Sequence, residues 1–237
     1  MHSQYSRLSQ ETPPVRLWTN VILAANVIAF MAHIVIGTEN RLILWGAKVN
    51  NLIAKGQIWR LLTPAFLHVN LIHLLLNCYS VHSLGPHLES LGGSKRFLVV
   101  FAVAAVTTSC LSFLMCKSPA VGASGAICGL IGALAVYSFR HRKLLNKAQE
   151  NLGRISRTVA FNMVLGLMSH EVDNWGHLGG FVGGAFVSWL IGPALRAVCK
   201  GTKVVLEDHP PAIQLWRCWL RWLPRLSLRR PSNNNQY

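Results

Sequence analysis

The chain has 237 residues, of which 51% are hydrophobic and only 13% are charged, and its formal net charge at pH 7 is +15. Soluble domains carry about 25% charged residues, so this composition excludes an ordinary soluble domain and indicates a protein that crosses a membrane several times. A strong positive charge can also indicate nucleic-acid binding. Here the lysines and arginines lie between apolar stretches, and we expect a lipid bilayer and no nucleic acid as partner.

Six apolar stretches are candidates for transmembrane helices, because about 20 apolar residues are enough to span a bilayer. In chain order they are 17–38, 61–88, 97–116, 118–139, 158–170 and 174–195. The fifth stretch is the shortest, and it is included because it separates two strong candidates. The predicted fold class is therefore all-α, a polytopic membrane protein with a bundle of six transmembrane helices.

Positive charge alternates from one connecting segment to the next. Lys and Arg concentrate in the N-terminal tail, in the loops after the second and fourth spans, and in the C-terminal tail. The positive-inside rule then places both termini on the cis side of the membrane, which is the cytosol, stroma or matrix. This pattern needs all six spans. It divides the chain into a cis-side N-terminal tail (1–16), a membrane domain (17–195) and a basic, Trp/Arg-rich cis-side C-terminal tail (196–237).

Two segments outside the spans combine tryptophan with basic residues. The loop 39–66 after the first span suits either a segment lying in the membrane interface or an ordinary packed loop. In the C-terminal tail, arginines are interleaved with Trp216, Trp219 and Trp222. That pattern is typical of a segment on anionic lipid, although a plain basic anchoring tail without further function is the favoured interpretation.

Polar residues inside membrane spans are costly, and by default they indicate function. Ser124 lies near the start of the fourth span, and His177 opens the sixth. His73 and Asn77 lie four residues apart, and therefore on one face of the second span. Counted back from Arg140 at about 1.5 Å per residue, Ser124 lies below the trans surface. All three clusters fall in this trans-side layer.

Glycine pairs spaced four residues apart lie beside the serine and beside His177. The fourth span carries Gly125 and Gly129, and the sixth carries Gly180 and Gly184. Such small faces let two helix backbones approach closely, although a single pair of this kind is most often plain packing. If the two faces meet, Ser124 and His177 come within hydrogen-bonding reach of each other.

A serine beside a neutral imidazole is the nucleophile–base pair that acyl transfer requires. The imidazole can take the hydroxyl proton and return it to a leaving amine. A tetrahedral intermediate also needs donors for its oxyanion. The candidates are the backbone around Gly122, Ala123 and Ser124 and the side chains of His73 and Asn77. Spacing alone does not decide which histidine is the base, but the glycine faces favour His177.

Other intramembrane chemistries lack their residues in this chain. The zinc-protease motif HExxH is broken, because Asn174 stands where a second histidine should follow His170 and Glu171. The two aspartates, Asp173 and Asp208, lie outside the middle of any span, which excludes an aspartyl protease. The six cysteines have no metal-ligand spacing. We expect neither a metal nor a cofactor.

Four motifs, in their order along the chain, resemble the rhomboid family of intramembrane serine proteases. They are Trp59-Arg60, His73-x-x-x-Asn77, Gly122-x-Ser124-Gly125 and His177-x-x-Gly180-x-x-x-Gly184. The resemblance covers roughly residues 17–195 and implies a six-helix rhomboid-like bundle with a Ser124/His177 dyad open to the trans side. It implies cleavage of transmembrane protein substrates without a metal. In this family pattern His73, Asn77 and the Ser124 amide hold the oxyanion.

The wider sequence, with WGAKVN, NCYS and DNWGH, looks most like the plastid rhomboid-like proteins of plants, which implies a chloroplast membrane. One position departs from the family pattern. Many members carry an aromatic residue four after the serine, packed on the dyad histidine, and here that residue is Cys128. The first interpretation is an active serine endopeptidase. The alternative is a catalytically inactive rhomboid-like protein that binds or routes membrane clients.

Overall fold

The computed structural model describes residues 15–36, 41–144, 153, 172–200 and 203–214. In chain order its helices are α2 (Leu17–Ile36), α3 (Arg41–Gly46), α4 (Asn50–Ala54), α5 (Leu71–Gly92), α6 (Ser94–Met115), α7 (Ser124–Arg140) and α9 (Asn174–Ile191). Two 3-10 turns, η1 (Ile58–Leu61) and η2 (Thr63–Phe66), lie between α4 and α5, and a hairpin of β1 (Leu195–Lys200) and β2 (Lys203–Asp208) follows α9.

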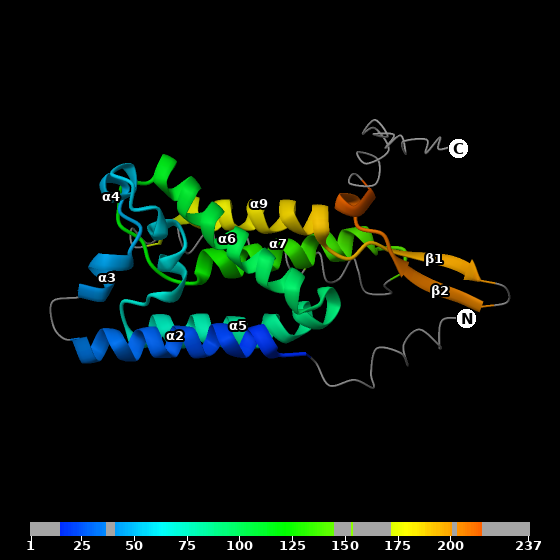
Figure 1. Ribbon diagram of the computed structural model, residues 1–237, viewed down its shortest axis with the longest axis horizontal. Coiled ribbons are helices and arrows are strands. Elements are labelled where there is room, and N and C mark those ends of the chain that lie inside the picture. The colour runs from blue at the N-terminus through cyan, green and yellow to red at the C-terminus, as the bar shows by residue number, and fades with distance from the viewer. Residues whose placement is uncertain (1–14, 37–40, 145–152, 154–171, 201–202, 215–237) are drawn as a thin grey trace, which may run out of the picture.

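The long helices form two layers joined by α6 (Figure 1). Helices α2 and α5 pack side by side in one layer, and α7 and α9 pack side by side in the other. Helix α6 runs obliquely between the layers and contacts both α7 and α9. Val81, Phe101, Ala104 and Leu130 fill the centre with at most 1% of their surface exposed. The short segments α3, α4, η1 and η2 gather at one end, where α7 and α9 begin.

The outside of the bundle is apolar. Ile28 and Val35 on α2, Leu76 on α5 and Phe186 on α9 are each more than half exposed. An apolar surface that extends over several helices marks contact with a membrane or a partner. Among the described residues, α2 and α6 are long and apolar enough to cross a membrane, and α7 is a shorter apolar helix. The predicted fifth stretch, 158–170, lies outside the described residues, so the six-span bundle remains a prediction.

The second predicted span starts later than its apolar stretch. The stretch 61–88 opens with the turns η1 and η2, and α5 begins only at Leu71. The side chain of Asn70 caps this helix by accepting a hydrogen bond from the His73 N–H at 2.8 Å. An asparagine at this position satisfies an otherwise unpaired amide, so the chain turns into a helix there rather than ten residues earlier.

The fourth predicted span also starts late. The stretch 118–139 opens with a loop, and α7 begins at Ser124. Gly122 has a φ of 123°, a backbone conformation that a right-handed helix excludes and that favours glycine. The helix therefore cannot extend backward through Gly122, and Ser124 becomes its first residue.

At the end of the bundle where α2 and α6 begin, a buried carboxylate joins three helices. Glu89 on α5 has no exposed surface and accepts hydrogen bonds from the backbone N–H groups of Trp18 (2.9 Å) and Thr19 (3.0 Å). It also accepts from the hydroxyls of Thr19 (2.9 Å) and Ser94 (2.8 Å). The first amides of a helix have no partner within it, and a negative charge there is stabilising. Glu89 thus caps α2 and binds the start of α6.

The described residues are mostly helical, as predicted, and the hairpin adds two strands that the all-α prediction did not include. Strand β1 begins at Leu195, and the two strands pair antiparallel from Leu195↔Asp208 to Lys200↔Lys203. The stretch 196–237, predicted as a tail, therefore opens with folded structure. Six-residue strands rich in valine have β propensity, but so short a pair needs further packing to be stable, and sequence periodicity did not reveal that packing.

The packing comes from polar contacts to the start of α6, the end of α7 and the segment after α9. The Asp208 carboxylate accepts from the Ala194 N–H at 2.8 Å and from Arg96 Nη1 at 2.6 Å. The Leu195 N–H donates to Nε2 of the buried His141 at 2.9 Å. Burial alone would raise the pKa of Asp208, but the hydrogen bonds from Ala194 and Arg96 and the positive charge of Arg96 lower it. The start of the C-terminal segment is thus fixed to α6 and α7.

We expect Glu89→Gln to lower the unfolding temperature of the purified chain. The carboxylate accepts four hydrogen bonds, whereas the amide keeps one acceptor oxygen, and each buried donor left unpaired costs about 1–3 kcal/mol. The control is Ser90→Ala, which removes only an exposed bond from the Val15 N–H (3.0 Å). Thermal unfolding in detergent measures both variants. A Glu89→Gln variant no less stable than Ser90→Ala would contradict the capping role.

Candidate active site

The structure brings Ser124 and His177 together at the end of the bundle where α7 and α9 begin. Nε2 of His177 lies 2.8 Å from Oγ of Ser124, which is a hydrogen bond between the first turns of α7 and α9. For Nε2 to accept the hydroxyl proton, Nδ1 of the same ring must carry the other proton. Nδ1 is buried and has no hydrogen-bond partner among the described residues. The histidine that reaches the serine is therefore the one favoured by the glycine faces.

The two glycine faces meet. A methyl group added to Gly180 would overlap the carbonyl of Gly125, and one added to Gly184 would overlap the backbone of Gly129. Gly132, one turn further along α7, lies against the backbone of Phe181 in the same way. The backbones of α7 and α9 are thus in direct contact, as the spacing predicted. Because this contact fixes the two helices relative to each other, it fixes the serine and the histidine in their first turns.

Helix α6 completes this packing, which the sequence did not reveal. Thr107 lies against Gly179 and Gly183, and Thr108 lies against Gly125. The hydroxyls of both threonines donate to the carbonyl of Ala104 at 3.1 and 2.8 Å, so their polar groups are satisfied within α6 and their small side chains can face the glycines. Three helices therefore interlock around small residues, and substitutions on α6 will also move the Ser124–His177 pair.

Asp173 sets the position of His177. Its side chain caps α9 by accepting from the Gly176 N–H at 2.9 Å, and its carbonyl accepts from the His177 N–H at 3.0 Å. The ring of His177 is consequently held one turn into the helix, level with the start of α7. Sequence reasoning considered Asp173 only as a protease carboxylate and missed this role. An aspartate directly before an apolar helix is a standard N-cap signal, and it would have found the residue.

Gly122, His73 and Ser124 converge on one spot. A methyl group added to Gly122 would lie 2.6 Å from Nε2 of His73 and 3.8 Å from Oγ of Ser124. Ala123, which lies between Gly122 and Ser124 in the sequence, is fully buried and is the N-cap residue of α7. The absence of a side chain at Gly122 keeps the space between the imidazole of His73 and the hydroxyl open. A small electronegative group of a ligand would fit there.

Asn77 lies where predicted but is engaged within its own helix. Its side chain is buried, and Nδ2 donates to the carbonyl of His73 at 2.8 Å. Behind His73 stands His68, whose ring meets it edge to face with the ring centroids 5.1 Å apart. His68 is 1% exposed, and neither of its ring nitrogens has a hydrogen-bond partner among the described residues. The sequence analysis did not single out His68, because one more histidine in an apolar stretch carried no spacing signal.

The loop after α2 is folded around Arg60. This guanidinium is 3% exposed and donates to Oε1 of Gln57 (2.7 Å) and to the carbonyls of Leu44 and Ala47 (both 2.8 Å). The neighbouring Trp59 stacks on Trp45 at 6.0 Å between ring centroids. The loop is therefore packed, while Trp45 and Ile58 on its outer side stay more than half exposed. The segment is thus a packed loop, and its location in the membrane interface stays a prediction.

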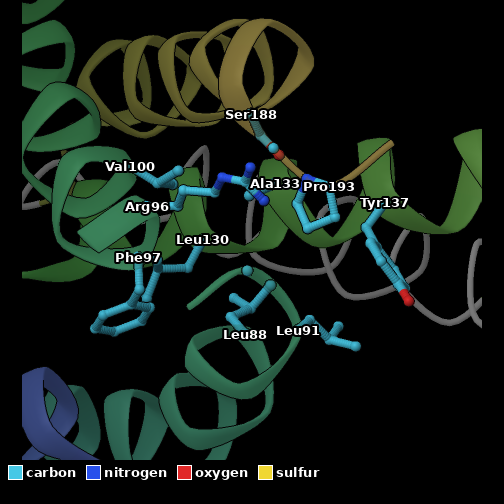
Figure 2. Close-up of a pocket in the computed structure, with 12 residues that line it drawn as sticks. Leu88, Leu91, Arg96, Phe97, Val100, Leu130, Ala133, Tyr137, Ser188 and Pro193 are labelled. Carbon is cyan, nitrogen blue, oxygen red and sulfur yellow. The ribbon is translucent and has the colours of Figure 1, made fainter. Parts of the chain in front are cut away.

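A second feature, an apolar cavity, lies at the end of the bundle where α9 ends (Figure 2). Its walls come from the end of α5, the start of α6, the second half of α7 and the end of α9, and they include Leu88, Phe97, Val100, Leu130, Tyr137 and Pro193. None of the predicted site residues lines it. The cavity is therefore separate from the serine–histidine pair.

Cys128, the residue that departs from the family pattern, is half-buried one turn after Ser124 and is a free thiol.

Comparison with known proteins decides the family. The Rhomboid domain family model matches residues 55–194, which is more than half of the chain. The chain belongs to the rhomboid family. Over 178 residues it is 36% identical to Rhomboid protease GluP of Bacillus subtilis, covering 74% of this chain and 35% of that protein. It is 29% identical over 165 residues to RHOMBOID-like protein 9, chloroplastic, of Arabidopsis thaliana, covering 68% and 37% respectively.

A third rhomboid relative matches over more of its own length. Putative rhomboid protease YdcA of Bacillus subtilis is 34% identical over 146 residues, which is 58% of this chain and 69% of that protein. By contrast, the chain spans only about a third of the length of Rhomboid protease GluP and of RHOMBOID-like protein 9, chloroplastic. Rhomboid membership makes this chain an integral membrane protein of an intramembrane protease family.

We expect Gly184→Ala to disrupt the site without touching either polar residue. The added methyl overlaps the backbone of Gly129, so α7 and α9 must separate, and small shifts of this kind cost about a hundredfold in rate when reacting groups are misplaced by about 1 Å. Labelling of Ser124 by a fluorophosphonate measures the effect. Gly92→Ala is the control, because its methyl meets no atom closer than 3.7 Å. Equal labelling of both variants would show that the glycine contact does not position the pair.

Proposed function

We propose that this protein is an intramembrane serine endopeptidase that cleaves transmembrane protein substrates with Ser124 as nucleophile and His177 as general base. The observation that carries the proposal is the 2.8 Å hydrogen bond between His177 Nε2 and Ser124 Oγ, inside a bundle whose outer surface is apolar. A nucleophile and base within hydrogen-bonding reach are the signature of covalent acyl transfer.

The chemistry follows from that hydrogen bond. Nε2 of His177 takes the proton as Oγ of Ser124 attacks the carbonyl carbon of the scissile peptide bond. The tetrahedral intermediate then collapses, the imidazolium gives its proton to the leaving amine, and an acyl-serine remains. A water molecule, deprotonated by the same imidazole, attacks the acyl group and releases the second product. Each proton taken by the histidine is returned within the cycle, so no metal is needed.

Three groups are candidates to stabilise the oxyanion. Ser124 is the first residue of α7, so its amide N–H is free of a helical partner. His73 lies beside Gly122 within the same space and supplies a ring N–H. Asn77 reaches a substrate oxygen only if its Nδ2 exchanges the bond to the His73 carbonyl for one to the intermediate. Donors that act on charge as it develops account for a large part of such catalysis.

The membrane arrangement completes the proposal. We place six transmembrane helices within residues 17–195, with the stretch 158–170 as the fifth, and both termini on the cis side. The hairpin then opens the cis-side segment. The similarity to RHOMBOID-like protein 9, chloroplastic supports a plastid membrane, whereas the likeness to a bacterial protease concerns the membrane domain common to both.

A second function is favoured by one residue. Cys128 occupies the position where many family members pack an aromatic ring on the base, and a smaller side chain leaves the imidazole less restrained. A protein with this substitution that binds transmembrane clients in the same site and releases them uncut is the alternative. Client binding without cleavage would distinguish it from the protease.

We expect Ser124→Ala and His177→Ala each to abolish cleavage of a transmembrane substrate whose helix is weakened by glycine or proline. Loss of either member of such a pair costs at least about a thousandfold in rate. Purified variants in detergent or vesicles, assayed by the appearance of cleaved fragments, give the measurement, and fluorophosphonate labelling of wild type but not of Ser124→Ala gives a second one. Cleavage that survives both substitutions would refute the dyad.

A further inference from the structure

Lys48 is an unusual buried cation. It lies between α3 and α4, is 1% exposed, and its ammonium donates to the carbonyls of Cys116 at 2.6 Å and Ser118 at 3.1 Å. Lysine is almost never fully buried unless it is paired. Burial lowers the pKa of Lys48, while the nearby Cys116 and Asp173 oppose that shift. Burying the ammonium of Lys48 costs free energy, and the hydrogen bonds that offset this cost all come from one segment, the loop 116–123.

The backbone of Lys48 is also hydrogen-bonded to the same loop. Its N–H donates to the carbonyl of Ala120 at 2.9 Å, and its carbonyl accepts from the Ala120 N–H at 3.1 Å, which makes an isolated antiparallel bridge. Further along, the Gly122 N–H donates to the carbonyl of Pro64 at 2.8 Å. The first half of the loop is thus held by Lys48, and the second half by the turn η2. The next residues along the chain are Ala123 and Ser124.

We propose that Lys48 is a positioning residue for the nucleophile. It anchors the loop 116–123 to the packed segment 41–66, and so sets where Ser124 and the amides before it lie relative to His177. This inference rests on the proposed protease function. It assigns to Lys48 no contact with substrate.

The geometry explains why a cation stands here. Cys116 is the C-cap residue of α6, and the carbonyls at a helix end carry partial negative charge that an ammonium stabilises. One ammonium can donate to several acceptors at once, so it binds the helix end and the loop together. An apolar side chain of similar length would satisfy neither carbonyl, because it has no N–H or O–H to donate.

Asn50 offers a matched control within the same segment. Its Nδ2 donates to the carbonyls of Phe113 (2.9 Å) and Cys116 (3.1 Å). It therefore binds the end of α6, as Lys48 does, but its side-chain hydrogen bonds end at Cys116 and do not reach the loop beyond it. Replacing either residue removes two hydrogen bonds, and only the lysine substitution removes a side-chain bond to Ser118 within the loop.

The test compares Lys48→Met, Lys48→Arg and Asn50→Leu with wild type in the full chain, at a temperature where all are folded. Hydrogen exchange of the amides of Ala120 and Gly122 reports the loop, and fluorophosphonate labelling of Ser124 with kcat and KM on a transmembrane substrate reports the site. We expect Lys48→Met to accelerate exchange and to lower labelling and kcat about ten- to a hundredfold, as misplacement of reacting groups does, with KM within about twofold.

In the same test Lys48→Arg recovers part of the lost rate, because its guanidinium can also donate to two carbonyls, and Asn50→Leu labels like wild type despite a lower unfolding temperature. If Lys48→Met is too unstable to purify, Lys48→Gln takes its place under the same criteria. Unchanged loop exchange, wild-type labelling by the lysine variant, or equal slowing by Asn50→Leu would each overturn the proposal.

Failure of the protease function has a different signature. Wild type that neither labels nor cleaves, while Lys48→Met still accelerates exchange of the loop, refutes the protease and with it the catalytic purpose of Lys48. Such a result leaves the anchoring of the loop 116–123 by Lys48 as a purely structural contact.

Discussion

The direct contact between the backbones of α7 and α9 is the constraint on which the rest of the site depends. Between lipid-exposed helices there is little hydrophobic driving force, so association relies on close packing and hydrogen bonds. Gly125, Gly129, Gly180 and Gly184 supply the surface for this packing. The pair formed by Ser124 and His177 stands at the end of that seam, and its 2.8 Å hydrogen bond tolerates no separation of the helices.

Buried charges in this protein are satisfied mainly by the backbone. Lys48 and Arg60 donate to carbonyls at the end of the bundle where α7 and α9 begin. At the other end, Glu89 accepts from amides that begin α2, and the half-buried Arg140 donates to the carbonyls of Trp189, Gly192 and Pro193 at the end of α9. In each case a charge meets groups that a helix end or an irregular loop leaves without partners. Few water molecules can reach these backbone groups, so the charged residues that pair with them determine where each helix can end.

The sequence predicted the parts of the site that have a local pattern. Glycines four residues apart predicted the contact of α7 and α9. The similar depth of Ser124 and His177 within their apolar stretches predicted that these two residues would meet. The catalytic roles of these residues remain predictions. The start of α5 at Leu71 was missed, because a run of apolar residues does not reveal 3-10 turns. The grip of Lys48 on the loop 116–123 was missed as well, because it joins segments far apart in the chain and follows no period. The hairpin was missed for the same reason, since it is held by Arg96 and His141 from other helices.

The anchoring of the hairpin has a mechanical consequence. Asp208 lies at the open end of the strand pair, opposite Leu195, and it is bonded to Ala194 and to Arg96 at the start of α6. Tension applied to the chain after Asp208 therefore passes into α6 and the junction after α9, without first stretching the strands. A pull on the chain after Asp208, whether by a tether or by a bound partner, is therefore borne by the contacts of Asp208 to Ala194 and Arg96 rather than by the strand pair.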